Sequence, residues 1–345
     1  MGDPLVSVVV PTYNRAYCLE RTLGSALSQS HRNLEIVVVD DGSTDATEEL
    51  VSTISRHDSR IRFFKQANKG VAAARNTGFA QCKGDFVALL DSDDVWRPWK
   101  IELQLACMTR FPDVGMTWTD MQAIDAAGHE VSGAYLRTMY SAWDHFSLDD
   151  LFTTHVPVGT IAARFADHGS RLLHFGEIFS EMLVGNLVHT PTVLLRRDRL
   201  NKVGGFDESL YPAGEDYDFH LRTCREGLVG FIDTPAISYQ VGMADALSRQ
   251  AVSLSTNFLK VVKRTLTEDR HRIDLPQEKI DWLLGEANAW IGEVMLNEGD
   301  NEKARQHLMT SLRYRPFHVR TAKLAAFSMM PHSLRSTVRS LLGRR

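Results

Sequence analysis

The stretch FVALLDSDDVW, residues 86–96, decides how the first half of the chain folds. Its five consecutive apolar residues, 86–90, have the length and composition of a strand that is buried on both faces. The run ends at three carboxylates within four positions, Asp91, Asp93 and Asp94. Because like charges this close repel one another, the cluster requires a counter-charge. The sequence therefore predicts a buried strand that delivers an anionic site at its end.

Short apolar runs alternate with helical patterns over the first 120 residues. Strands are predicted at 5–10, 34–39, 61–64, 85–90 and 114–119. Helices are predicted between them, at 16–29, 45–56, 70–81 and 97–110. This alternation predicts an α/β fold with a mostly parallel sheet flanked by helices, in which ligands bind beyond the carboxyl ends of the strands. Polar segments follow three of these strands: PTYNR (11–15), DDGSTD (40–45) and DSDD (91–94).

The pattern changes after residue 120. Further elements are predicted as a strand at 190–198, a helix at 214–227 and two closing strands at 229–234 and 236–241. From about residue 250 onward the pattern is helical, so we expect two domains, residues 1–250 and residues 251–345. Within the second, residues 282–316 have the pattern of one tetratricopeptide-like hairpin. A single copy does not make an array, and a helical extension packed on the main domain is the alternative.

Charge is unevenly distributed along the chain, whose formal net charge is −4. From Lys303 to the C-terminus there are ten Lys or Arg residues and no Asp or Glu. Such a block suggests an anionic partner, and we expect residues 303–345 to contact an anionic membrane surface, where each cation contributes about 1 kcal/mol. The alternative is a solvated tail that compensates the acidic remainder of the chain. Nucleic-acid binding is not expected, because few aromatic residues, such as Tyr314 and Phe317, are interleaved with these cations.

Membrane insertion and secretion are not expected. No apolar run approaches the roughly 20 residues of a membrane-spanning helix, and the N-terminal residues lack the positive charge of a secretion signal. The four cysteines are scattered without paired or metal-ligand spacing, as in proteins of a reducing compartment. We therefore expect a cytoplasmic protein that is peripheral on the inner face of the membrane if its basic tail binds there.

The acid cluster at 91–94 has two interpretations. Oxygen ligands favour hard divalent ions such as Mg²⁺ or Mn²⁺, and no neighbouring His or Cys in the sequence indicates zinc. Because Mg²⁺ is commonly held by one or two carboxylates together with substrate phosphates, the cluster predicts a phosphate-bearing substrate. The alternative is a solvated turn that caps the helix predicted from residue 97.

Two further polar segments follow the first and second strands. Asp45 and Glu48 have the spacing of a helix N-cap with a capping box, which leaves Asp40 and Asp41 unexplained. A carboxylate at that strand end could accept a hydrogen bond from a nucleotide base. Tyr13 could stack on the base or be an ordinary half-exposed aromatic residue. No Gly-x-Gly-x-x-Gly and no Gly-x-x-x-x-Gly-Lys-Ser/Thr follows a strand, so dinucleotide and P-loop binding are disfavoured.

Five segments, taken in order, resemble those of a known family. They are VSVVVPTYNR (6–15), VVVDDGSTD (37–45), NKGVAAARNTGF (68–79), FVALLDSDDVW (86–96) and GGFDESLYPAGEDYDFHLR (204–222). Over about residues 5–250 the chain resembles the inverting glycosyltransferase family 2. The resemblance implies a GT-A fold, the fold of nucleotide-diphospho-sugar transferases. The helical, basic C-terminal extension of this chain is similar to the extensions of some bacterial members.

The resemblance also implies a donor site. The matching positions are Pro11, Thr12, Tyr13, Asn14, Asp41, Arg75, Asp91, Ser92 and Asp93. Asp41 matches the residue that binds the uracil edge, and Arg75 matches a basic residue beside the nucleotide. Asp93 or Asp94 matches the ligand of a divalent cation, Mn²⁺ or Mg²⁺, and the other matches a ribose or sugar contact.

On the acceptor side, the resemblance implies that Asp216 is the catalytic base. Glu215 precedes it, and Gly205, Phe206 and Asp207 match an acceptor-side loop. In a single displacement the acceptor hydroxyl attacks the anomeric carbon and the nucleoside diphosphate leaves, so that one base on the opposite face gives inversion. The cation stabilises the charge of the leaving group.

Two departures from the family pattern bear on function. The Gln-x-x-Arg-Trp segment of processive, polymer-forming members is absent, which favours transfer of a single sugar. The His that follows the strand near Tyr239 in many members, often as an additional metal ligand, is also absent. His189 lies on the expected acceptor side and is interpreted as structural.

We therefore expect a hexosyl- or N-acetylhexosaminyl-type transferase that uses a UDP-sugar and a glycan or lipid-linked acceptor in polysaccharide biosynthesis. One alternative is a catalytically inactive GT-A-fold scaffold, which predicts a degraded acid cluster. Another is nucleotidyl transfer, which would require a Gly-rich loop and a lysine near the first strand, and PTYNRAY (11–17) has neither.

Overall fold

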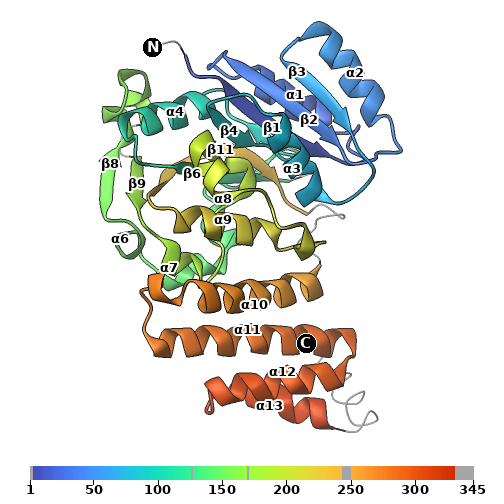
Figure 1. Cartoon of the computed structure of the whole chain (residues 1–345), viewed down its shortest axis with the longest axis vertical. Helices are drawn as coiled ribbons and strands as arrows, with labels where there is room; N and C mark the ends of the chain where they lie inside the picture. Colours follow the sequence, from blue (N-terminus) through green and yellow to red (C-terminus); the bar gives the residue numbers. More distant parts are fainter. Residues whose placement is uncertain (1–2, 126, 169–170, 243–249, 331–345) are drawn as a thin grey trace. The chain divides into compact units, whose positions relative to one another are not determined.

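A computed structural model describes residues 3–125, 127–168, 171–242 and 250–330 of the chain (Figure 1). It contains two compact units, residues 1–246 and residues 247–345. Within the described ranges, no helix combines the length and the apolar character needed to cross a membrane.

The first unit begins as predicted, with parallel strands that alternate with helices (Figure 1). In chain order these are β1 (Val6–Thr12), α1 (Leu19–Leu27), β2 (Leu34–Asp40), α2 (Thr47–His57), β3 (Ile61–Lys65), α3 (Val71–Gln81) and β4 (Phe86–Leu89). The strands lie in the order β3-β2-β1-β4, and each neighbouring pair is parallel. Every residue of β1, β2 and β4 is buried, as expected for strands covered on both faces.

The sheet changes direction beside β4. Strand β10 (Leu194–Arg196) inserts between β4 and β6 (Met116–Ile124) and runs antiparallel to both. Because β10 begins where β4 ends, the residues that precede β10 lie beside the acidic loop that follows β4. The strand predicted at 190–198 is shorter in the structure, because a 3₁₀ turn over Thr190–Thr192 precedes it.

The remaining strands extend the sheet in the order β10-β6-β11-β9-β8. They are β11 (Val229–Gln240), β9 (Leu172–Gly176) and β8 (Thr154–Pro157), with β5 (Val95–Trp96) paired to β11 and β7 (Glu130–Ser132) paired to β6. The two closing strands predicted at 229–234 and 236–241 are wrong, since both belong to β11. The register between β11 and β6 shifts on both sides of Pro235. Proline has no N–H to donate to a neighbouring strand. In the sequence, Pro235 therefore has the appearance of a residue between two strands.

The other helices of this unit are α4 (Lys100–Arg110), α5 (Leu136–Met139), α6 (Leu148–Leu151), α7 (Phe179–Met182), α8 (Arg197–Val203) and α9 (Glu215–Arg225). The helices predicted at 97–110 and 214–227 are confirmed as α4 and α9. Helix α9 is followed by Gly227, whose φ of 110° suits a helix end. An aromatic cluster of Trp118, Phe152 and Phe231 fills the core beside β6 and β11.

The capping box predicted at Asp45 and Glu48 is wrong. Helix α2 begins at Thr47 with no side-chain cap at its N-cap residue, Ala46. One carboxylate oxygen of Asp45 accepts a hydrogen bond from the Thr47 amide (3.0 Å), and the other accepts one from the Ala16 amide (3.1 Å). Asp45 therefore bonds both to the first residue of α2 and to the loop after β1, without the reciprocal pair of a capping box.

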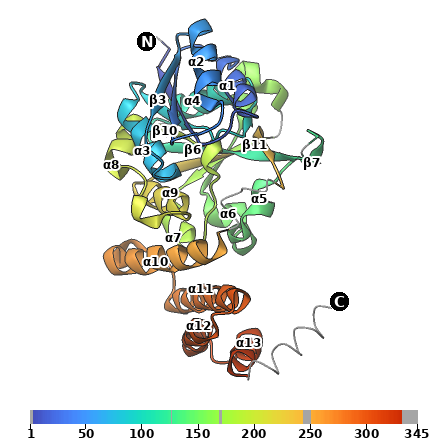
Figure 2. The same cartoon turned by 90° about the vertical axis from the view of Figure 1, so that its right-hand side faces the viewer.

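The second unit consists of α10 (Ala251–Glu268), α11 (Gln277–Glu298), α12 (Asn301–Tyr314) and α13 (Val319–Met329), each packed on the next (Figure 2). Helices α11 and α12 form a hairpin that turns at Gly299, whose φ is 85°. Leu308 of α12 is fully buried and packs on Gly292 of α11. A tetratricopeptide-like character and an independent domain beginning at 251 remain predictions. Residues 331–345 of the basic tail lie outside the described ranges.

Candidate functional site

The segment predicted to line a nucleoside leaves the sheet at the end of β1. Pro11 and Thr12 are buried within the strand, whereas Tyr13 keeps 46% of its surface exposed. Asn14 adopts the left-handed conformation (φ 53°), which Asn visits more readily than most residues. Its side-chain oxygen accepts a hydrogen bond from the Thr44 amide over 2.8 Å. The loops after β1 and β2 are thereby fixed together, with the ring of Tyr13 open to solvent.

Asp41 lies at the end of β2 and is almost fully buried, with 4% of its surface exposed. One of its carboxylate oxygens accepts hydrogen bonds from Gln66 Nε2 (2.8 Å) and the Lys69 amide (3.0 Å). The other accepts one from the Gly70 amide (2.7 Å). Asp41 therefore orders the loop that leads into α3. The predicted contact with a base edge would use the remaining acceptor capacity of the same carboxylate.

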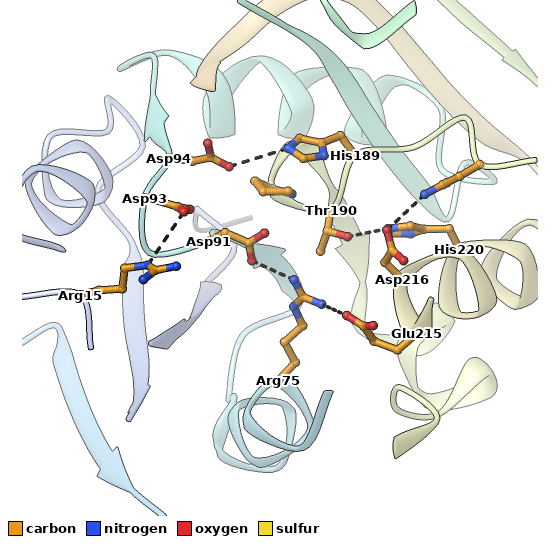
Figure 3. A network of polar contacts seen from close by, with 12 residues as sticks. Arg15, Arg75, Asp91, Asp93, Asp94, His189, Thr190, Glu215, Asp216 and His220 are labelled. Atoms are coloured by element: carbon orange, nitrogen blue, oxygen red, sulfur yellow. Dashed lines mark hydrogen bonds and ion pairs between the residues drawn. The ribbon is translucent and has the colours of Figure 1, made fainter. Parts of the chain in front are cut away.

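The counter-charge of the acid cluster is Arg75, which projects from α3 and is 4% exposed (Figure 3). Its Nη2 donates a hydrogen bond to Asp91 Oδ1 and its Nη1 donates one to Glu215 Oε1, each over 2.9 Å. Burial disfavours the charged guanidinium, but the two carboxylates outweigh this effect and raise the pKa of Arg75. Burial and the charge of Asp216 raise the pKa of Glu215, and Arg75 opposes that rise.

The remaining acids of the cluster occupy a tight turn between β4 and β5. The Asp94 amide donates a hydrogen bond to the Asp91 carbonyl (3.1 Å), and the Ser92 carbonyl accepts one from Thr22 Oγ1 (3.0 Å). Asp93 Oδ2 lies 3.9 Å from Arg15 Nε. The solvated turn considered as an alternative does not fit Asp94, because only 1% of its surface is exposed.

Asp94 faces His189, for which the sequence predicts a structural role (Figure 3). Asp94 Oδ2 and His189 Nε2 are 3.8 Å apart, and neither atom has a hydrogen-bond partner. Burial, together with the charges of Asp93 and Asp91, raises the pKa of Asp94. Burial lowers the pKa of His189 to about 4. Two buried polar atoms thus face one another without the contact that would compensate their desolvation.

The predicted base, Asp216, lies in the first turn of α9, where the helix N-terminus favours negative charge. Asn186 Nδ2 donates a hydrogen bond to Asp216 Oδ2 (3.3 Å), a contact that the sequence did not indicate. Glu215 is buried, whereas Asp216 is half-buried and accessible. The two adjacent carboxylates therefore have different surroundings, because Glu215 is paired with Arg75, whereas Asp216 is partly exposed and bonds to Asn186 (Figure 3).

The predicted acceptor-side loop packs on α3. Asn76 Oδ1 accepts a hydrogen bond from the Phe206 amide (2.7 Å), and a Cβ at Gly205 would lie 2.4 Å from the same oxygen. The ring of Phe206 stacks on Phe219 with centroids 4.2 Å apart. The guanidinium carbon of Arg75 lies 5.0 Å from the centroid of the Phe206 ring. Asp207 accepts a hydrogen bond from the Ser209 amide (3.0 Å) and closes the turn.

Three residues of this site were not assigned a function from the sequence: Tyr140, Asn186 and His189. The Tyr140 hydroxyl lies 3.1 Å from His189 Nδ1. Burial, followed by the charge of Asp216, raises the pKa of Tyr140. The position of Asn186 and His189 in the sequence could have indicated them, because the segment before an antiparallel β10 must lie beside the end of β4.

No group of three His, Cys, Asp or Glu side chains that could hold a metal occurs in the part of the chain that the structure describes. The residues present nevertheless fit a divalent cation at one point. Asp94 and His189 offer a buried oxygen and a buried nitrogen, both unpartnered, on facing side chains. Mg²⁺-type sites commonly take the rest of their ligands from substrate phosphates and water.

Comparison with known proteins relates residues 7–164 to one protein family and the fold to solved structures. Residues 7–164 match the family model of glycosyl transferase family 2. An uncharacterized glycosyltransferase of Haemophilus influenzae is 39% identical over 132 residues, 38% of this chain and 52% of that protein. A chondroitin synthase of Escherichia coli is 36% identical over 138 residues, 40% of this chain and 20% of that protein. The chain thus spans about half of the first relative and a fifth of the second.

Among solved structures, S. aureus TarS residues 1–349 in complex with UDP-GlcNAc has a TM-score of 0.59. It is 18% identical in sequence, and the match covers 90% of this chain and 81% of TarS 1–349. At this identity the likeness concerns the fold, and it agrees with the GT-A fold expected from the sequence. The matched family model and the relatives show that residues 7–164 are a glycosyl transferase family 2 domain.

Proposed function

We propose that the chain is an inverting glycosyltransferase that moves one sugar from a nucleotide-sugar donor to a hydroxyl of a glycan or lipid-linked acceptor. The family supports sugar transfer, and the UDP-GlcNAc of the TarS structure supports a UDP-sugar as donor, with a hexosyl or N-acetylhexosaminyl group. The chondroitin synthase relative supports a glycan acceptor and a role in polysaccharide synthesis. The absence of Gln-x-x-Arg-Trp from the sequence supports transfer of one sugar at a time.

The observation that carries this proposal is the surroundings of Asp216. Its accessible carboxylate lies at the start of α9, accepts a hydrogen bond from Asn186, and is flanked by the buried Arg75–Glu215 pair. A general base needs an ionised carboxylate within reach of the attacking hydroxyl. We assign to Asp216 the removal of the hydroxyl proton while the acceptor oxygen bonds to the anomeric carbon and the bond to the diphosphate breaks.

We assign the donor nucleotide to the loops after β1, β2 and β4. Its nucleoside would be lined by Pro11, Thr12, Tyr13 and Asn14, with Asp41 at the base edge. Arg75 would hold Asp91 in place, and Asp91 and Ser92 would contact the ribose or sugar. This assignment is supported by the exposed ring of Tyr13 and by the carboxylate of Asp41, whose bonds fix the adjoining loop.

A divalent cation, Mn²⁺ or Mg²⁺, would be held by Asp93 and Asp94. When bound, it supplies Lewis-acid stabilisation of the charge that develops on the leaving diphosphate. On the acceptor side we assign Gly205, Phe206, Asp207 and Glu215 to the floor of the site. The support for this assignment is the packing of that loop against Asn76 of α3 and against Phe219 of α9.

A contact between residues 303–345 and an anionic membrane is a further part of the proposal. Lys303 pairs with Asp300 (2.9 Å), Arg320 with Glu293 (2.8 Å) and Arg315 with Glu286. Acids of the same helical unit thus neutralise part of the basic block, which favours the alternative of internal compensation. Four of its ten cations, Arg335, Arg339, Arg344 and Arg345, lie outside the described residues. Co-sedimentation with anionic vesicles, with and without residues 303–345, distinguishes the two alternatives.

The proposed activity is tested with purified full-length chain and a panel of UDP-, GDP- and dTDP-sugars, with and without Mn²⁺. We expect a thermal shift with UDP-sugars and turnover of the donor in the presence of glycan acceptors. Asp216→Asn should keep the thermal shift and lose turnover, and the exposed control Asp144→Asn should keep both. The proposal fails if no donor is turned over by any variant, or if Asp216→Asn turns it over as fast as the unmodified chain.

A further inference from the structure

The side chains of Asp94 and His189 face one another. The proposed function assigns a role to Asp94 and none to His189. Asp94 comes from the turn after β4, and His189 from the segment before β10, 95 positions later in the chain. Their exposed fractions are 1% and 9%. Asp94 Oδ2 and His189 Nε2 point toward one another, 3.8 Å apart (Figure 3).

The separation of the two atoms excludes a direct hydrogen bond, whose N–H···O length is about 2.7–3.2 Å. Leaving a buried polar group without a partner typically costs about 1–3 kcal/mol, and more for a charged group. Both atoms lack partners, so the protein tolerates two such costs at one place. A cation between them would satisfy both, since two ligand atoms that each lie about 2.0–2.1 Å from an ion are up to about 4.2 Å apart.

The other nitrogen of His189 is already engaged, which defines how the ring is presented. Its Nδ1 lies 3.1 Å from the Tyr140 hydroxyl. In the tautomer that carries its proton on Nδ1, the Nδ1–H donates a hydrogen bond to the Tyr140 oxygen, and Nε2 keeps its lone pair directed at Asp94. Metal-binding histidines characteristically use such a partner on the second nitrogen to fix the ring and its tautomer.

The charges around the ring also suit a cation. Asp91, Asp93 and Asp216 act on His189 as nearby negative charges, and Arg75 is the nearby positive charge. Asp91 and Glu215 already neutralise Arg75 through hydrogen bonds. Arg15 lies beside Asp93, and Arg21 acts on Asp94. With Asp94 and Glu215 included, the carboxyl groups around the two facing atoms still outnumber these three guanidinium groups.

We propose that His189 Nε2 and Asp94 Oδ2 together bind the divalent cation of this site, and that the imidazole makes the site prefer Mn²⁺ over Mg²⁺. This inference rests on the proposed function and assigns its cation a nitrogen ligand. Imidazole suits transition ions, whereas Mg²⁺ takes oxygen ligands almost exclusively. His189 thereby supplies a ligand from the segment before β10, whereas the family's additional His would follow the strand near Tyr239.

The inference is tested with Mn²⁺ alone and with Mn²⁺ plus UDP on the full-length chain, by electron paramagnetic resonance. We expect bound Mn²⁺ to show hyperfine coupling to a ¹⁴N nucleus of histidine. His189→Gln should abolish that coupling and reduce the preference for Mn²⁺ over Mg²⁺ at least about 10-fold. Tyr140→Phe should keep the coupling but weaken Mn²⁺ binding about 10- to 100-fold. The matched buried control His174→Gln should change neither.

The inference is overturned if His189→Gln, folded by circular dichroism, keeps the ¹⁴N coupling or the full preference for Mn²⁺. It is also overturned if unmodified chain with UDP binds Mn²⁺ without any nitrogen coupling. These outcomes leave the proposed function standing, because Asp216→Asn tests sugar transfer separately. Failure of donor turnover with an intact ¹⁴N signal would instead reject the activity and keep the cation site.

Discussion

Arg75 and Glu215 lie 140 positions apart in the sequence, yet Nη1 of the arginine donates a hydrogen bond to Oε1 of the glutamate over 2.9 Å. The same guanidinium binds Asp91, so one buried cation joins α3, the turn after β4 and the start of α9. Breaking a buried pair by removing one partner leaves an uncompensated charge and costs about 3–5 kcal/mol. Arg75 thus connects the proposed donor and acceptor sides of the site through one side chain.

Replacement of Arg75 by methionine should lower the free energy of unfolding by about 3–5 kcal/mol, because Glu215 would remain buried without its counter-charge. The double variant Arg75→Met/Glu215→Gln should recover part of that loss, since the amide is neutral. Urea denaturation measures both variants. Arg60→Met, which breaks the partly exposed Arg60–Asp58 pair, should cost no more than about 1 kcal/mol. A double variant as unstable as the single one would contradict this account.

Asn186 should act as a positioning residue for Asp216. Asn186→Ala removes the donor to Asp216 Oδ2, and hydrogen bonds to charged groups are worth about 1.5–3 kcal/mol. We therefore expect kcat to fall about 10- to 100-fold while the KM for the donor stays within about 2-fold, because the hydrogen bonds of Asn186 go to Asp216 and to the Val188 amide. Steady-state kinetics measures the split, and Asn201→Ala on the exposed face of α8 is the control. An equal fall of kcat and rise of KM would instead indicate a general distortion of the site.

His174 should make the stability of the protein depend on pH. It is 2% exposed, and burial, together with the neighbouring His155, lowers its pKa to about 4. Because the folded state disfavours its protonation, the stability that it contributes is present above about pH 6.5 and is lost as the pH falls toward 4. At pH 5 the loss from this one group is about 2 kcal/mol.

The variant His174→Phe should therefore lose less stability than the unmodified chain between pH 7.5 and pH 5, by about 2 kcal/mol. Phenylalanine can take the place of the ring, which stacks on Phe231 with centroids 6.0 Å apart. Denaturation curves at the two pH values give the difference, and His57→Phe at an exposed position is the control. If the drop is the same with and without His174, another group is responsible.

Gly292→Val should destabilise the α11–α12 hairpin. A Cβ at this position would lie 2.5 Å from Leu308 Cγ, and overpacking of a core typically costs about 1–3 kcal/mol. Hydrogen exchange in 277–314 should become faster, while binding of sugar nucleotides by the first unit should be unchanged. Gly24→Ala in α1, where a Cβ meets no atom within 4 Å, should be neutral or slightly stabilising. Loss of nucleotide binding in Gly292→Val would argue against two independent units.

The sequence by itself determined the architecture of the first half of the chain. The apolar runs that became β1, β2 and β4 are fully buried, and a buried run of five to seven residues between polar turns has few alternatives to a strand. Helices α1 and α2 follow from apolar periodicity. Local pattern also identified which acids follow which strand. Those acids were expected to lie close together, because the carboxyl ends of parallel strands meet at one edge of the sheet.

Only the tertiary structure decided how those acids are partnered. Arg75 meets Glu215, and Asp94 meets His189, across separations along the chain that no local pattern encodes. Asp45 is a similar case, because its second carboxylate oxygen accepts a hydrogen bond from the amide of Ala16, which lies 29 positions away in the sequence. Hydrogen bonds and ion pairs depend on distances of a few ångström between side chains, and antiparallel insertion of β10 beside β4 sets those distances for His189.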